Sequence, residues 1–257
     1  MQVVPVPRRQ LERGGYARGE ETRARIIATA LRIFGQQGYD HSSTRLIAAQ
    51  AGVNPPALQY YFGGKEGLHR ACAQFIIDRA QAVMSPAFSR ASRALLARDR
   101  REAVTALCDL LDALTDALTA AGSESWSRFI ARGKADGAGP AMPMIRERIG
   151  LPLITMVASL VGLATACADD ELNRLRALLL LGPVNWIHAN REGTLMLLQW
   201  REFDAGRLAL LKQTVRAHVR AALRAPVRVP ASSVRRSAAR RPSAHRRRAS
   251  ARPRPTK

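Results

Sequence analysis

Apolar residues recur along the chain at the three- and four-residue spacing of amphipathic helices, and no stretch alternates as a half-buried strand does. The first stripe stops at Gly38 and consists of Ile26, Ile27, Ala30, Leu31 and Phe34. A leucine-rich stripe over residues 107–118 stops at Gly122, and further stripes cover residues 144–168, 172–186 and 208–219. The pattern predicts an all-α protein, and the low aromatic content of 5% agrees with helical bundles.

Between the first two long stripes the chain has two short helical patterns joined by a turn. Ser43, or its neighbour Ser42, stands where a hydroxyl caps the first short helix, and Gly52 lies in the turn. Asn54 is expected to cap the second short helix through its side-chain oxygen. Pro55 then occupies the first helical position, where a missing N–H costs nothing. These signals predict two short helices with a tight turn between them.

The second short helix has one apolar and one outward face. Leu58 and Phe62 are four residues apart and are expected to share a buried face. Gln59, Tyr60 and, in part, Tyr61 are left to point outward. Two helices of this kind form a helix-turn-helix, in which the second helix enters the major groove of DNA.

The residues around this motif resemble the TetR family of bacterial transcription repressors over residues 21–79. The matching residues are Arg25–Phe34, Gly38-Tyr39, Ile47-Ala48, Ala51-Gly52-Val53, Tyr61-Phe62 and Lys65-Glu66-Gly67-Leu68. The CecR-like branch of the family is especially similar at Asn54, Ala57, Tyr60-Tyr61-Phe62-Gly63 and the run from Leu68 to Ala71-Cys72-Ala73-Gln74.

The resemblance implies an all-α homodimer that binds double-stranded operator DNA and releases it when a small-molecule effector occupies the C-terminal domain. Family members dimerise through their last two helices, which correspond here to residues 170–190 and 205–223. The family commonly has an aromatic residue where this chain has Gln59, and a Lys or Arg near Pro55. These departures indicate a changed operator rather than a loss of DNA binding.

Contacts to DNA are expected from the starts of the helices and from the outer face of the second short helix. Residues 43–45 and Lys65 are placed for phosphates, because helix N-termini, hydroxyls and cations attract anions. The two prolines of the second helix, with Gln59 and Tyr60, are candidates for base edges. Tyr61 is expected to combine a buried ring with a hydroxyl on a phosphate. The full set of candidate DNA-binding residues is Ser43, Thr44, Arg45, Asn54, Pro55, Pro56, Gln59, Tyr60, Tyr61 and Lys65.

Charge divides the chain into four predicted segments. The net charge is +21, and residues 226–257 alone carry eleven basic residues and no acid. We expect a flexible basic arm at 1–19, a helix-turn-helix domain at 20–80, a helical regulatory and dimerisation domain at 81–225, and a disordered Arg-rich tail at 226–257. The tail favours non-specific DNA retention, with RNA or acidic-partner binding and a solvated extension without a role as the other readings. A less specific, DNA-coating protein that uses this tail is therefore the alternative function.

Several apolar and aromatic residues of the second half have the composition of an effector pocket. Binding pockets are mostly apolar with a few polar groups, and Met adapts to varied ligands. The alternative is that these residues are ordinary core. The candidates are Trp126, Phe129, Met144, Met156, Trp186 and His188.

No motif of an enzyme or cofactor site appears. The five histidines have no HxxxH or HExxH spacing, and no GxGxxG, P-loop or GxSxG sequence occurs. The three cysteines are far apart and suit a reducing compartment. No signal peptide opens the chain, and the longest apolar runs fall short of a membrane span or are interrupted. We therefore expect a cytoplasmic protein with no catalytic site, no cofactor, no bound metal and no membrane association. A ligand-binding bundle that does not bind DNA is a third reading.

Overall fold

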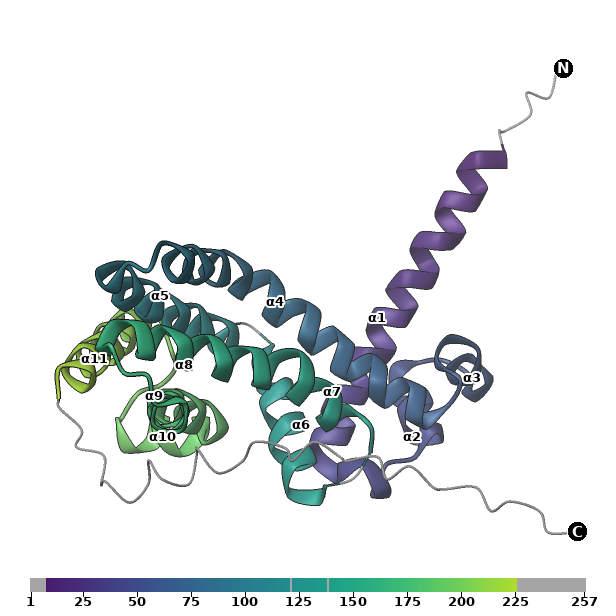
Figure 1. The fold of residues 1–257 in the computed structure, drawn as a ribbon. Coiled ribbons are helices and arrows are strands. Elements are labelled where there is room, and N and C mark those ends of the chain that lie inside the picture. Colours follow the sequence, from purple (N-terminus) through teal and green to yellow (C-terminus); the bar gives the residue numbers. More distant parts are fainter. Residues whose placement is uncertain (1–7, 121, 138, 226–257) are drawn as a thin grey trace, which may run out of the picture. The chain divides into compact units, whose positions relative to one another are not determined.

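The computed structural model describes residues 8–120, 122–137 and 139–225, and every regular element within these ranges is a helix (Figure 1). The all-α prediction is thus confirmed for this part of the chain, and the predicted tail at 226–257 lies outside it. In chain order the elements are α1 (Arg8–His41), α2 (Thr44–Ala51), α3 (Pro55–Phe62), α4 (Lys65–Ala97), α5 (Arg100–Thr119), α6 (Ser123–Asp136), α7 (Ala141–Ile145), the π-helical turn η1 (Arg146–Gly150), α8 (Leu151–Thr165), α9 (Asp170–Ala189), α10 (Arg191–Leu197) and α11 (Ala205–Arg224).

Two separate clusters of buried side chains hold these helices together. The first joins α1, α2, α3 and the first half of α4, with one face of α6 and α7 packed against them. We call α1, α2, α3 and the first half of α4 the head, and the whole cluster the head cluster. The second joins the rest of α4 with α5, α8, α9 and α11, and we call it the C-terminal core. Figure 1 shows α4 running from α2 and α3 to α5. Helix α4 therefore belongs to both clusters and connects them.

The start of α1 differs from the predicted flexible arm. The helix begins at Arg8 rather than near Glu21, so residues 8–19 are helical, while residues 1–7 lie outside the described ranges. Gly14 and Gly15 each weaken a helix by about 1 kcal/mol, but the residues around them are mostly good helix formers. At the other end the helical conformation breaks at Gly38, where φ is 80°, as the sequence predicts.

From the sequence, Ser85-Pro86 predicts that the helix starting near Lys65 ends or kinks there. In the structure, α4 does not end at this point but continues through Pro86 to Ala97. A proline inside a helix removes one backbone hydrogen bond. Beyond it, however, Ala87, Ala91 and Ala94 are buried against α5, and their small side chains allow the two helices to approach closely. This packing offsets the lost hydrogen bond and keeps the helix going.

The stretch from α7 through η1 to α8 forms one 25-residue helical run, Ala141–Thr165. With a mean hydropathy of 1.6 in its most apolar window, it is long and apolar enough to cross a membrane by those two criteria. This helical run begins at Ala141, before the apolar stripe that the sequence predicts from residue 144, so the helix includes residues that the apolar pattern alone does not. Its inner face, with Val157, Leu160 and Val161, is buried in the C-terminal core.

Candidate DNA-binding face and ligand pocket

The turn between α2 and α3 is built by local signals. The Ser43 hydroxyl accepts a hydrogen bond from the Leu46 N–H at 3.1 Å, so it caps α2 as predicted. Gly52 ends α2 with φ at 64°, a conformation that glycine adopts without strain. Asn54 occupies the N-cap position of α3 in extended conformation, but its side chain makes no capping hydrogen bond. The predicted side-chain cap at Asn54 is therefore wrong, since the backbone geometry and Pro55 start the helix without it.

Helix α3 rests on Leu58 and exposes the opposite side. Leu58 is 1% exposed in the head, whereas Tyr60 is 84% exposed. Gln59 is exposed beside it, as are the two prolines at the start of the helix. The structure thus brings together on one outer surface the four residues predicted to meet base edges, Pro55, Pro56, Gln59 and Tyr60.

The residues predicted to meet phosphates lie at the ends of neighbouring elements. Ser43 and Arg45 are exposed and Thr44 is half-buried at the start of α2. Lys65, at the start of α4, donates from Nζ to the Asp40 carbonyl at 3.2 Å, and its ammonium lies 4.6 Å from the centre of the Tyr39 ring. These two contacts hold the Lys65 cation in place within the head.

Tyr61 is half-buried, and a Cβ atom built on Gly19 would lie 3.7 Å from its hydroxyl oxygen. The hydroxyl therefore lies beside α1. Two arginines of α1 that the sequence reasoning did not place also hold this part of the head. Arg25 donates from Nε to the Ala51 carbonyl at 2.9 Å, at the C-terminus of α2 where a cation is favourable. Arg23 lies 5.5 Å from the centre of the Phe62 ring. Only Arg25 had a sequence signal, because it belongs to the matching family residues.

A largely apolar pocket of about 540 Å³ lies among α4, α5, α6, α7, α8 and α9, with part of its wall supplied by η1. Its polar groups are few. Lys134 and Arg146 are exposed cations, and Asn185 and His188 come from α9. Burial lowers the pKa of His188 to about 4, and the charges of Arg191 and Lys134 act in the same direction. No carboxylate lines this apolar pocket.

Of the six residues predicted for an effector pocket, Trp126 and His188 line the apolar pocket. The other four lie elsewhere. Phe129 is buried in the head cluster with its ring 5.0 Å from that of His69, and Met144 packs partly buried against the same cluster. Met156 packs against the C-terminal core, and Trp186 is 53% exposed on the outer face of α9. Helix periodicity alone did not distinguish a pocket wall from a core face or an open face.

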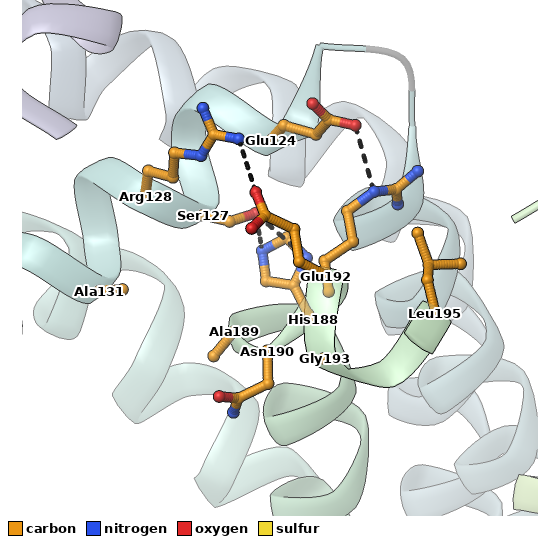
Figure 2. A pocket seen from close by; sticks show the side chains of 11 residues that line it. Glu124, Ser127, Arg128, Ala131, His188, Ala189, Asn190, Glu192, Gly193 and Leu195 are labelled. Atoms are coloured by element: carbon orange, nitrogen blue, oxygen red, sulfur yellow. Dashed lines mark hydrogen bonds and ion pairs between the residues drawn. The ribbon is translucent and has the colours of Figure 1, made fainter. Parts of the chain in front are cut away.

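A second, polar pocket of about 440 Å³ lies between α6 and the junction of α9 and α10 (Figure 2). Two ion pairs cross it, Arg128 to Glu192 at 3.0 Å and Arg191 to Glu124 at 3.2 Å. His188 lies between the two pockets, with Nε2 2.6 Å from the Ser127 hydroxyl oxygen. This pair does not form a hydrolase triad, because Ser127 donates to the Ser123 carbonyl and no carboxylate among the described residues bonds His188.

Helix α6 connects the pockets to the head. One face carries Trp126, Ile130 and Lys134 into the apolar pocket. The other face packs so closely on α1 that a Cβ atom on Gly35 would lie 3.0 Å from the Phe129 nitrogen. A side chain at position 35 would therefore be crowded, and α6 and α1 are in direct backbone contact here.

Comparison with known proteins matches both parts of the chain. Residues 26–72 match the family described as bacterial regulatory proteins, tetR family. Residues 101–226 match the C-terminal domain of the HTH-type transcriptional dual regulator CecR. The CecR protein of Shigella flexneri is 34% identical over 209 residues, which cover 79% of this chain and 91% of that protein. This chain belongs to the TetR family and is CecR-like. It is a DNA-binding transcriptional regulator and not an enzyme.

Solved structures agree with this TetR-family fold. The fatty acid degradation regulator FadR from Bacillus halodurans has a TM-score of 0.54 at 16% identity, covering 80% of this chain and 97% of that one. AibR in complex with isovaleryl coenzyme A and operator DNA also has a TM-score of 0.54, at 19% identity, covering 77% of this chain and 95% of that one. Within the described residues, no group of three or more His, Cys, Asp or Glu side chains is arranged to hold a metal ion.

Proposed function

We propose that this TetR-family regulator is a repressor that binds operator DNA as a homodimer and releases it when a small molecule enters the apolar pocket. The observation that carries the proposal is α3, which is anchored by buried Leu58 while its prolines, Gln59 and Tyr60 face solvent together. A short helix of this kind enters the major groove with its outer side chains at base edges. We also infer that the protein works in the cytoplasm, where operator DNA is accessible.

The side chains of the proposed DNA-binding face have different roles. Gln59 is suited to pair with adenine, and the proline and tyrosine atoms beside it are suited to contact a thymine methyl group. Arg45 and Lys65 are suited to phosphates, which position the protein without reading sequence. The amide of Gln59 lies near Gly64, since a Cβ atom there would be 3.3 Å from its oxygen. We propose that this side chain turns towards a base on binding.

The proposed dimer is supported by α9. Its exposed side carries Leu175, Leu178, Leu179 and Trp186, each between 52% and 67% exposed, at the spacing of one helical face. We call these four residues the α9 stripe. A contiguous apolar stripe on a soluble protein marks an interaction surface, and a second copy of the chain covers it by twofold symmetry. Leu210, 55% exposed on α11, adds a further apolar position on the last helix.

The proposed ligand response is supported by the position of α6 between the apolar pocket and α1. A ligand that changes the separation of α6 from α4, α5 and α9 also moves the face that touches Gly35. Because α1 is part of the head, such a shift changes the distance between the two α3 helices of a dimer. AibR, which shares the fold, has been crystallised with isovaleryl coenzyme A and operator DNA.

The experiment that tests the DNA-binding part of the proposal is selection of bound sequences from random DNA, followed by footprinting on the selected site. The proposal expects a two-fold symmetric site with half-sites one helical turn, or a multiple of it, apart. Uniform coating without a selected sequence would instead favour the DNA-coating alternative, which rests on the eleven basic residues at 226–257.

A truncated chain without Arg228–Lys257 separates these two functions. If the tail binds phosphates, its loss should reduce the slope of log K against log salt for random DNA by about 0.9 per contact removed. The preference for the selected operator should remain, because we assign it to α3. Loss of operator preference in the truncated chain would contradict that assignment.

A further inference from the structure

We propose that the apolar pocket selects amphipathic anions, binding an apolar body within the pocket and a carboxylate or similar acid group between Lys134 and Arg146. This inference rests on the proposed function, since it names the chemical class of the effector. It concerns the same pocket and goes beyond the presence of a ligand to its charge.

The walls of the pocket fit an apolar body. Aliphatic and aromatic side chains from six α-helices make up most of the lining, among them Trp126, Ile130 and Leu153. A volume of about 540 Å³ lies within the range of pockets that enclose small molecules. Transfer of an apolar chain from water into such a pocket contributes about 25 cal/mol for each Å² buried.

The charges of the pocket fit an acid group. Lys134 comes from α6 and Arg146 from η1, so the two cations approach the opening from separate elements. Neither makes a hydrogen bond or ion pair with another described residue, although arginines nearby do, such as Arg132 with Asp136 and Arg148 with Gln74. With no carboxylate in the lining, these two cations have no counter-charge within the pocket.

The local backbone supports the same assignment. Arg146, Ile149 and Gly150 all line the pocket, and all three belong to the π-helical turn. A π-helical turn widens the helix by one residue and is frequent at functional sites. Arg146 and Ile149 lie three residues apart on one face of this turn, and both line the pocket. His188, with its pKa lowered to about 4 by burial, is neutral at neutral pH and adds no charge to the opposite wall.

The test uses the full chain and three probes with the same ten-carbon body, namely decanoate, decanamide and decyltrimethylammonium, with affinity measured by calorimetry at neutral pH. We expect decanoate to bind on the order of tenfold more tightly than decanamide, because hydrogen bonds to charged groups are stronger than neutral ones. Decyltrimethylammonium should bind more weakly than decanamide, because it meets two like charges.

Variants then locate the preference. In the double variant Lys134→Gln/Arg146→Gln the ratio of decanoate to decanamide affinity should fall to about one, while decanamide affinity stays unchanged. Arg148→Gln is the matched control, because it removes one cation from the same π-helical turn. The Arg148 side chain bonds Gln74 and does not line the apolar pocket. In this control the ratio should stay near its original value.

Three results would overturn the proposal: no binding of any probe, equal affinity for decanoate and decanamide in the unmodified chain, or an unchanged ratio in the double variant. Operator release is measured separately, by adding decanoate to the operator complex. Charge-selective binding that leaves the operator complex intact would support the ligand class while contradicting the proposed regulatory role. Binding and operator release together would support both.

Discussion

The head and the C-terminal domain bury their residues in different ways. In the head, each short helix has its apolar face covered within the chain, and the exposed residues of α3 are mostly suited to DNA. In the C-terminal domain, only one side of α9 is buried in the C-terminal core, and the four large apolar residues of the α9 stripe are exposed to solvent. Under the proposed function, the head forms a complete surface for DNA, while the C-terminal domain offers the α9 stripe to a second copy and the apolar pocket to a ligand. The two C-terminal surfaces are adjacent, since Leu178 belongs to the stripe and also lines the pocket.

The largest effect on operator binding is expected when the α9 stripe is made polar, in the double variant Leu175→Asp/Leu179→Asp. Both residues belong to the α9 stripe and neither lines the apolar pocket. Two buried charges from each subunit at the proposed twofold interface should convert the proposed dimer to a monomer, which light scattering measures. Operator affinity should fall on the order of 100-fold or more, because two linked half-site contacts become one.

The control for this variant is Leu96→Asp. Leu96 is 84% exposed near the end of α4, outside the stripe, so its replacement should leave both the dimer and operator affinity unchanged. A double variant of the stripe that stays soluble, dimeric and fully active on operator DNA would refute the assigned interface.

A smaller effect on operator affinity is expected when single residues of the proposed DNA-binding face are replaced. Gln59→Ala should cost about 1–3 kcal/mol in operator binding and relax the base preference at one position of each half-site. Lys65→Ala should weaken operator and random DNA alike, since it removes a phosphate contact. Competition binding with operator and shuffled DNA measures both. If the two variants lose specific and random binding in the same proportion, the division of roles is wrong.

The third prediction concerns pH and the contact between the head and α6. His69 is 2% exposed among Phe34, Tyr39 and Phe129, and burial lowers its pKa to about 4, with the nearby Lys65 acting in the same direction. The unfolded chain takes up a proton near pH 6.5 and the folded chain only near pH 4, so stability falls as pH falls through that interval. Between pH 7.5 and 5.5 the loss from this group should be about 1 kcal/mol.

Chemical denaturation at the two pH values measures this loss. The variant His69→Leu should show a smaller decrease in the free energy of unfolding between pH 7.5 and 5.5 than the unmodified chain, whatever its absolute stability. The exposed His41, replaced by Gln, serves as the control and should leave the decrease as it was. An equal pH dependence in His69→Leu and the unmodified chain would contradict the prediction.

The smallest effect distinguishes two caps within the head. Ser43→Ala removes a capping hydrogen bond and should cost about 1 kcal/mol of stability. Asn54→Ala removes a side chain that makes no such bond, so its cost should be clearly smaller. Thermal unfolding of both variants gives the comparison. An equal or greater loss for Asn54→Ala would show that its side chain stabilises the start of α3 after all.

These cases indicate how far sequence reasoning reaches in this molecule. Several features set by neighbouring residues were predictable, such as the Ser43 cap and the Gly52 turn, although the side-chain cap predicted at Asn54 was wrong. They depend on interactions within about five residues, which the printed sequence displays directly.

Features that depend on distant contacts were not predictable. The continuation of α4 through Pro86 depends on packing against α5, and the separation of Phe129 from the pocket depends on which side of α6 meets α1. The π-helical turn at residues 146–150 has no sequence signature of its own, so the position of Arg146 at the pocket was visible only in three dimensions.

Helix α6 has a thermodynamic consequence under the proposed function. Its two faces line the ligand pocket and contact α1 of the head, so in the proposed mechanism α6 couples the ligand to the DNA-binding head. Two ligands coupled through a shared element change each other's affinity by the same factor. Operator DNA should therefore lower the affinity for the effector as strongly as the effector lowers the affinity for operator DNA. A cell that holds more operator copies thus shifts the effector concentration at which the protein responds.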